Sequence, residues 1–133
     1  MISVGIIPNP AAGKDIRRIV AQGRFVPNHE KVNILKRVLA GLDAANIERV
    51  LFMPDTGSLG KNALAGLELN LSAEFVDMPV FHEENDSSRA ARSMRERGVG
   101  CIITLGGDGT NRAVAKESRD VPIMPISTGT DNV

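Results

Sequence analysis

The sequence predicts a single α/β domain, built on an open, mostly parallel, doubly wound sheet with helices on both faces. Two observations lead to this class. Strand-length apolar runs alternate five times with helix-patterned or irregular segments along the 133 residues. One of those runs, Val99–Leu105, is apolar throughout, as expected for a strand that a parallel sheet buries on both faces. The length suits one domain.

The first elements follow from short apolar runs and one long periodic segment. Ile2–Ile7 is expected to be a strand, because Pro8-Asn9-Pro10 ends the apolar run. Lys31–Ala45 is expected to be an amphipathic helix, since apolar residues recur there at spacings of three and four. Those residues are Val32, Leu35, Val38, Leu39 and Leu42. The next strand is expected at Arg49–Met53, just before Pro54.

The middle of the chain carries weaker signals. A helix is predicted at about Lys61–Leu69, although Gly66 weakens it. Ala73–Val80 follows as the third strand, and Pro79 limits that strand to a sheet edge or to its own end.

The last elements begin with a helix whose start is marked by Asp86, an expected N-cap that accepts from the amides of the first turn. Gly98 ends this helix. Val99–Leu105 is the fourth strand, and a glycine-rich turn leads from it into a short helix from about Asn111. Pro122–Ile126 completes the five strands.

Composition excludes several classes of protein. Sixteen Lys and Arg balance sixteen Asp and Glu, whereas a general nucleic-acid binder needs surplus positive charge. The absence of Trp and Tyr, with only four Phe, removes the aromatic platforms used for single strands. A lone cysteine, Cys101, is expected to be a small buried thiol. We find no signal peptide and no membrane span, and expect a cytoplasmic protein that binds small nucleotides. The sequence leaves open whether the protein is a monomer or a homo-oligomer.

The chemistry is concentrated in Gly-Gly-Asp-Gly-Thr at 106–110, which follows the buried strand and opens a helix. Three glycines remove the Cβ atoms that would keep an oxyanion away from the main chain. Free amides at a helix start carry partial positive charge and favour phosphate. Asp108 would repel phosphate unless it has another task, such as orienting hydrated Mg²⁺ or accepting a proton from a hydroxyl. The alternative is a tight turn in which Asp108 only caps the helix.

The best-known phosphate motifs do not account for this loop. Gly60-Lys61 and Gly13-Lys14 lack the following Ser or Thr and the earlier glycine of a P-loop. Gly98-Val99-Gly100 precedes a strand, whereas the dinucleotide fingerprint follows one. The sequence therefore indicates a different kind of nucleotide site.

Three segments together resemble the NAD kinase/diacylglycerol kinase superfamily, which is more remotely related to phosphofructokinases. Gly-Gly-Asp-Gly-Thr at 106–110 is similar to its signature, and Asn-Pro-Ala-Ala-Gly at 9–13 resembles its turn after the first strand. Pro125–Asn132 is similar to its P-x-x-G-T-x-N segment, with one residue more than the shortest versions. The residues of the first and last of these segments are most similar to those of the ATP-NAD kinase-like branch that includes acetoin-catabolism X-type proteins.

The resemblance implies a role for each matching residue. Asp108 would activate the acceptor hydroxyl or organise metal and phosphate, so it is the expected catalytic residue; no residue is assigned as a metal ligand. ATP and Mg²⁺ are the implied cofactors. The expected nucleotide-binding residues are Asn9, Gly13, Gly106, Gly107, Gly109, Thr110, Asn111, Gly129, Thr130 and Asn132.

The resemblance also implies that residues 1–133 are the N-terminal nucleotide-binding domain of a longer protein, without the family's β-rich second domain. The expected activity is transfer of the γ-phosphoryl of ATP to a hydroxyl of NAD or a related small molecule, with the isolated fragment inactive. The alternatives are a diacylglycerol- or sphingoid-type lipid kinase and a non-catalytic nucleotide-binding regulatory protein of a catabolic operon.

Several polar residues near these loops remain open between two interpretations. Asp55 lies on the expected ligand edge and is either a ligand contact or a local structural residue. Four cations can neutralise phosphate or can be solvated charges on helices. They are Lys14, Arg17, Arg18 and Arg112.

Overall fold

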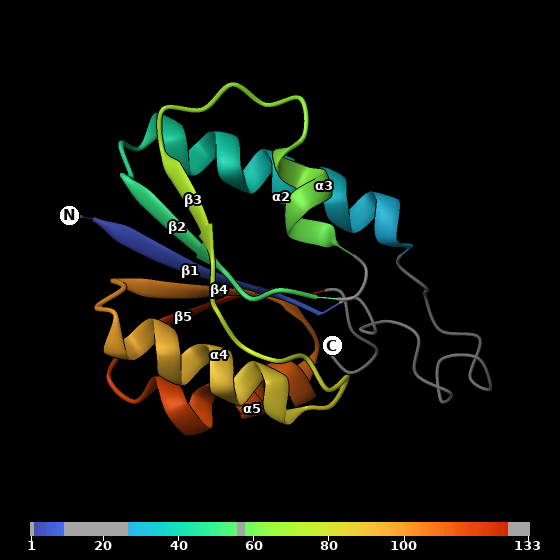
Figure 1. Ribbon diagram of the computed structural model, residues 1–133, viewed down its shortest axis with the longest axis vertical. Helices are drawn as coiled ribbons and strands as arrows, with labels where there is room; N and C mark the ends of the chain where they lie inside the picture. Colours follow the sequence, from blue (N-terminus) through green and yellow to red (C-terminus); the bar gives the residue numbers. More distant parts are fainter. Residues whose placement is uncertain (1, 10–26, 56–57, 128–133) are drawn as a thin grey trace.

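The computed structural model describes residues 2–9, 27–55 and 58–127, which form a five-stranded sheet with helices on both faces (Figure 1). The strands are β1 (Ser3–Pro8), β2 (Arg49–Phe52), β3 (Ser72–Phe75), β4 (Cys101–Gly106) and β5 (Ile123–Ser127). The helices in these ranges are α2 (Asn28–Ala44), α3 (Leu59–Leu64), α4 (Asn85–Glu96) and α5 (Asp108–Ser118).

The strand order is β3-β2-β1-β4-β5, and all neighbouring pairs are parallel. Strand β1 is central, with Gly5 opposite Leu51 of β2 and Ile102 of β4. The chain moves outward from β1 to β3 and then crosses to β4, so the strand order reverses between β1 and β4. In open α/β sheets, ligands bind outside the carboxyl ends of the strands at this switch point. The predicted fold class is confirmed.

Two apolar clusters hold the helices to the sheet. Ile6, Leu35 and Phe52 belong to the cluster under α2 and α3. Ile7 and Met94 belong to the cluster on the opposite face, under α4 and α5. All six residues of β1 are buried, because helices cover both of its faces. The site at the end of β1 therefore stands on a rigid central strand.

Most expected elements are present with shifted ends. Helix α3 is shorter than predicted, because it ends at Leu64 before Gly66, whose φ of +79° is outside the helical region. Strand β3 is an edge strand, as Pro79 indicated, and it ends at Phe75. Helix α5 begins at Asp108, three residues before the predicted start, directly after Gly107.

The start of α4 differs from the prediction for Asp86. Asp86 lies in the first turn of the helix, and its buried carboxylate accepts from main-chain N–H groups that precede the helix. The donors are Phe81 at 3.1 Å, His82 at 2.9 Å and Glu83 at 3.3 Å, and Arg89 adds an ion pair from the next turn. Asp86 thus anchors the incoming loop instead of capping the first-turn amides.

Replacing Asp86 with Asn should lower the free energy of unfolding by about 1–2 kcal/mol at pH 7. Burial alone raises the pKa of Asp86, but its main-chain donors and Arg89 outweigh burial and hold that pKa below its ordinary value. The ionised carboxylate therefore stabilises the fold above about pH 4 and loses this effect as the pH falls through the lowered pKa. Urea unfolding between pH 3 and pH 7 should show a shallower acid dependence in the variant.

Glu84→Gln is the matched control, because Glu84 is an exposed carboxylate beside the same helix start. It should leave the pH profile unchanged. Equal acid dependence of Asp86→Asn and the unchanged protein would contradict the assigned role of Asp86.

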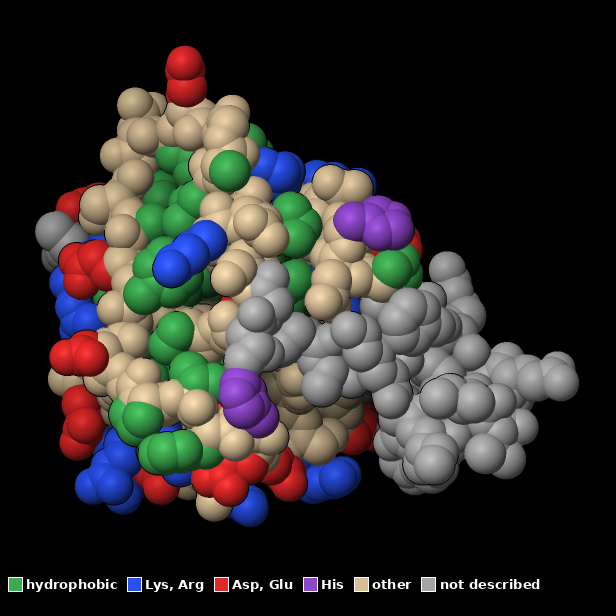
Figure 2. All heavy atoms as spheres, turned by 45° about the vertical axis from the view of Figure 1, so that its right-hand side comes forward, with side chains coloured by type: hydrophobic (Ala, Val, Ile, Leu, Met, Phe, Trp, Pro, Cys, Tyr) green, Lys and Arg blue, Asp and Glu red, His purple; other side chains and the backbone are tan. Residues whose placement is uncertain are grey.

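The surface view shows charges of both signs mixed along the bottom of the face in Figure 2, over α4 and α5. Ion pairs join neighbours there, with Arg95 3.6 Å from Glu117 and Arg92 3.9 Å from Glu96. Such mixing differs from the single-sign stripe of a nucleic-acid-binding surface. In the described ranges, no helix combines the length and the apolar character needed to cross a bilayer.

Candidate functional site

The candidate site lies where β1 and β4 end side by side. Pro8 pairs with Leu105 at the end of the ladder, and the next main-chain N–H, that of Asn9, donates to the Leu105 oxygen at 2.9 Å. A single residue, Gly107, separates the end of β4 from the start of α5. The sheet thus brings Asn9 next to the glycine-rich loop, although Asn9 and Gly106 are far apart in the sequence.

The side chain of Asn9 connects the two loops directly. Its Nδ2 donates to Oγ1 of Thr110 at 2.8 Å, and Thr110 is buried in the first turn of α5. Asn9 therefore contacts β4 through its main chain and α5 through its side chain. This contact positions two of the predicted nucleotide-binding residues relative to each other.

Gly106 is required by close packing at this point. A Cβ built on Gly106 would lie 2.6 Å from Oγ1 and 2.8 Å from Cβ of Thr110. Only a residue without a side chain allows β4 to turn directly into α5 at this distance. The glycine thus lets Thr110 meet Asn9.

The first turn of α5 presents main-chain N–H groups at the same edge. Gly107 is the N-cap in an extended conformation, and as a glycine it has no side chain with which to cap the helix. A Cβ on Gly109 would meet no atom within 4 Å, so packing does not require a glycine there. Space beside Gly109, with amides that lack intrahelical partners, is the geometry in which a helix start binds an anion.

Asp108 is the first residue of α5 and is half-buried, as are Gly107 and Gly109. The N-cap position itself is occupied by Gly107, so Asp108 is the acidic residue of the first turn and not the N-cap of α5. The side chain of Asn111 contacts the sheet, because its Oδ1 accepts from Oγ1 of Thr104 at 2.5 Å. Asn111 therefore fixes α5 on β4.

Asp55, which the sequence left open, has a structural partner. The Asp55 carboxylate accepts from the N–H of Leu59 at 3.1 and 3.2 Å and so holds the start of α3. Cys101 is half-buried at the start of β4 and packs against the core under α2 and α3. Burial raises the pKa of the Cys101 thiol, which disfavours the reactive thiolate. Arg112 is exposed.

Lys31 is a residue near the site that the sequence analysis did not single out. It is fully buried in the first turns of α2, and its Nζ donates to the main-chain oxygen of Asn9 over 3.4 Å. A signal was present in the sequence, because Lys31 stands four residues before Leu35 and eight before Leu39 on the buried face of the helix. A charged residue at the spacing of the buried apolar residues of a helix is expected to lie on the same buried face.

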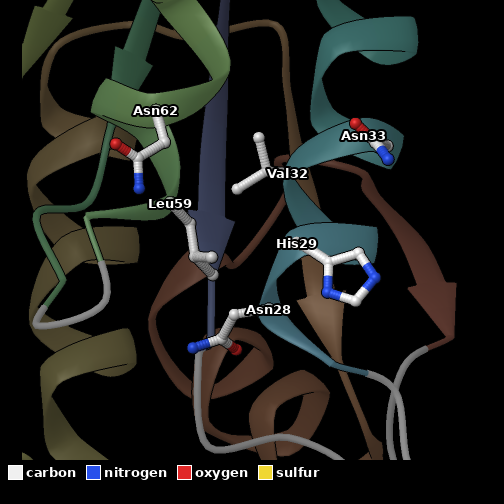
Figure 3. Close-up of a pocket in the computed structure, with 6 residues that line it drawn as sticks. All are labelled: Asn28, His29, Val32, Asn33, Leu59 and Asn62. Carbon is white, nitrogen blue, oxygen red and sulfur yellow. The ribbon is translucent and has the colours of Figure 1, made fainter.

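A cavity of about 370 Å³ lies between α2 and α3 (Figure 3). Its volume is within the range of small-molecule pockets. Val32 and Leu59 lie between the helices, and Asn28 sits at the helix start, where its buried Oδ1 has no hydrogen-bond partner among the described residues. His29, Asn33 and Asn62 complete the lining.

Several predicted site residues lie outside the described residues. They are Gly13, Gly129, Thr130, Asn132 and the cations Lys14, Arg17 and Arg18. The described part of the predicted site consists of Asn9 and residues 106–111, and Asn9 meets this second segment at the contact with Thr110.

Comparison with known families now accounts for the geometry. Residues 4–132 match the family described as "ATP-NAD kinase N-terminal domain". The chain belongs to this family. The expected resemblance to the ATP-NAD kinase-like branch is confirmed, and the switch-point site lies within the matched domain.

Two curated relatives match almost the whole chain. "Acetoin catabolism protein X" of Cupriavidus necator is 46% identical over 137 residues, which cover 97% of this chain and 38% of that protein. "ATP-dependent 6-phosphofructokinase" of Halothermothrix orenii is 28% identical over 130 residues, covering 95% of this chain and 36% of that protein. The ATP-NAD kinase domain described here thus spans less than two fifths of the length of either relative.

The described residues at this edge have features that suit the phosphates of a nucleotide. The open space at Gly109 and the free helix start suit phosphate oxygens. Among the described residues no cluster of three or more His, Cys, Asp or Glu could hold a metal. Mg²⁺ suits this arrangement, because it commonly binds through phosphates, water and one or two carboxylates instead of a protein cage. Asp108 is the carboxylate in the loop that would orient it.

Proposed function

We propose that this domain binds ATP and takes part in transfer of its γ-phosphoryl group to a hydroxyl, with NAD as the acceptor. The observation that carries the proposal is the joining of Asn9 to Thr110 across the switch point, beside the glycine-rich start of α5. Membership of the ATP-NAD kinase family supports the nucleotide and the reaction class. The name of one relative denotes an ATP-dependent kinase, which also supports phosphoryl transfer.

In this proposal the glycine-rich loop binds the phosphates of ATP, and the Asp108 carboxylate acts on the acceptor hydroxyl. Main-chain N–H groups at Gly107–Thr110 donate to phosphate oxygens. The close packing of Thr110 against Gly106 keeps Thr110 in place. Asn9 fixes the neighbouring loop so that both sides of the site keep their spacing. Phosphoryl transfer depends chiefly on positioning and on neutralising charge, so this arrangement needs no protein nucleophile. Mg²⁺, when bound, would supply further charge neutralisation at the phosphates.

Asp108 acts on the acceptor. Its carboxylate accepts the proton of the acceptor hydroxyl, while the hydroxyl oxygen forms a bond to the γ-phosphorus and the bond between that phosphorus and the β,γ-bridging oxygen breaks. The products are a phosphate monoester, ADP and a protonated Asp108, which returns its proton to solvent. This role requires a carboxylate at the loop, and Asp108 offers one in the first turn of α5, next to the N-cap Gly107.

The acceptor site is proposed to involve a second domain of the full-length protein, since the chain spans only part of its relatives. We propose small nucleotides as partners and the cytoplasm as the location.

A second candidate is a nucleotide-binding regulatory protein without turnover. The relative called "Acetoin catabolism protein X" favours this second candidate, because its name refers to a metabolic process and does not specify an enzymatic reaction.

Incubation of the full-length protein with ATP, Mg²⁺ and NAD should produce NADP and ADP in equal amounts. Quantifying both nucleotides by liquid chromatography measures the reaction directly. ADP without NADP would reject NAD as the acceptor and leave phosphoryl transfer to another hydroxyl. ATP binding without any ADP formation, with several metals and acceptors, would favour the regulatory candidate.

A further inference from the structure

The cavity between α2 and α3 lies at the first turns of both helices, which begin at the carboxyl edge of the sheet. Helix α3 follows β2, and the Asp55 carboxylate just beyond that strand holds the N–H of Leu59 at 3.1 and 3.2 Å. Helix α2 begins at Asn28, which lines the cavity. The cavity is therefore at the edge where ligands of open α/β sheets bind.

The start of α2 is also in contact with the candidate phosphate site. Lys31, one turn after Asn28, donates through Nζ to the main-chain oxygen of Asn9 at 3.4 Å. Asn9 donates through its side chain to Thr110 in the first turn of α5 at 2.8 Å. The cavity and the glycine-rich loop are thus neighbours of the same turn of the main chain, at Asn9.

The lining of the cavity is uncharged and mixes apolar with polar side chains. Figure 3 shows Leu59 and Asn62 on the α3 side and Val32 on the α2 side. The described lining residues include no Asp, Glu, Lys or Arg; they are Asn28, His29, Val32, Asn33, Leu59 and Asn62. Phosphate would lack positive charge here, and an acyl chain would bury amide groups without partners. An uncharged ring with hydrogen-bonding edges suits such a lining.

Asn28 supplies an acceptor that awaits a donor. Its Oδ1 is buried, and none of the described residues donates a hydrogen bond to it. A buried acceptor without a donor has a cost in free energy, so such an atom calls for an explanation. A ligand N–H group that enters the cavity would satisfy this oxygen.

We propose that the cavity binds the base of the nucleotide whose phosphates lie at α5, and that the exocyclic amino group of adenine donates to Oδ1 of Asn28. The faces of a purine can pack on Val32 and Leu59, and Asn side chains pair well with the amino edge of adenine. This assignment rests on the proposed function and adds to it the place of the base, on α2 and α3.

Three ligands separate the base from the phosphates in calorimetric titrations of the full-length protein. They are ATP, purine riboside triphosphate, which is ATP without its exocyclic amino group, and inorganic tripolyphosphate. We expect ATP to bind about fivefold more tightly than purine riboside triphosphate, the effect of one hydrogen bond between uncharged groups. Tripolyphosphate should bind more weakly than either nucleotide.

Asn28→Leu should abolish the preference for ATP over purine riboside triphosphate and leave the affinity for tripolyphosphate unchanged. The melting temperature of the unliganded variant should not fall, because the change removes a buried acceptor that has no donor. Asn85→Leu is the matched control, since Asn85 is also the first residue of its helix, α4, but is exposed. It should alter none of the three affinities.

The comparison of the two nucleotides on the unchanged protein needs no variant, and equal affinities would overturn the proposal. Equal losses of ATP and tripolyphosphate affinity in Asn28→Leu would overturn it too, by showing a structural role for Asn28. If the expected preference for ATP is found but no ADP forms with any acceptor, the base site stands and the kinase proposal fails. If tripolyphosphate binds as tightly as ATP, the phosphate site stands and the base site fails. A protein that binds no nucleotide would contradict both.

Discussion

Replacing Asp108 with Asn should reduce turnover of the full-length protein by about 10²–10⁴-fold, the usual contribution of a general base. Asn has the same shape as Asp but cannot accept the hydroxyl proton at neutral pH. ATP affinity should be retained or slightly increased, because the change removes a negative charge from the loop that binds phosphate. The fold should tolerate it, since the N-cap of α5 is Gly107 and Asn keeps the size of the side chain at position 108. Steady-state kinetics and calorimetric titration with ATP separate these two effects.

Asp120→Asn is the control, because Asp120 is exposed just beyond the other end of α5. It should change neither turnover nor binding. Full turnover in Asp108→Asn would remove Asp108 from the chemical step. If neither the unchanged protein nor Asp108→Asn forms ADP and both keep the biological output, the regulatory candidate would replace the kinase.

Replacing Gly106 with Ala should weaken ATP binding about a hundredfold or more. The added Cβ would lie 2.8 Å from Cβ of Thr110, an atom fixed to the main chain, so the start of α5 must move. That movement separates Thr110 from Asn9 and misplaces the amides that hold phosphate. Losing one or two charge-assisted hydrogen bonds accounts for the expected loss of affinity. Overpacking should also lower the free energy of unfolding by about 1–3 kcal/mol.

Two other glycines make this test specific. Gly41→Ala in α2 meets no atom within 4 Å and lies far from the site in the chain, so it should leave ATP affinity unchanged and raise stability slightly. Gly109→Ala also meets no atom, so it should fold normally, but its Cβ should hinder a phosphate in the open space beside α5. Wild-type ATP affinity in Gly106→Ala, measured by calorimetry, would contradict the assigned geometry.

The fold could be predicted because its signals are local. Apolar runs and helical periodicity depend on neighbouring residues, and five strands and four helices were expected close to where they lie in the structure. The glycine-rich loop and the loop that contains Asn9 were also expected at one edge of the sheet, because both follow strands of a parallel sheet. Their role in nucleotide binding stays a prediction. Their direct hydrogen bond, between Asn9 and Thr110, was not predicted, since side-chain contacts over such a separation depend on register.

What the sequence analysis missed depends on tertiary contacts. Asp86 was predicted to accept from the amides of the first helical turn. Its carboxylate instead accepts from the N–H groups of Phe81 and His82, in the loop that precedes the helix. The length of α3 was overestimated, since its start depends on Asp55 and its end on the turn at Gly66. Lys31 was passed over because periodicity identifies apolar residues on a helix face and gives no reason for a charge among them.

The central claim is that main-chain N–H groups at residues 106–110 bind the phosphates of a nucleotide. Titrating ¹⁵N-labelled full-length protein with ATP and recording amide spectra tests this claim residue by residue. The amide signals of Gly107, Gly109 and Thr110 should shift strongly and saturably, together with that of Asn9, while signals from the distant end of α4 stay in place. Saturable ATP binding that leaves these four signals unmoved would contradict the claim.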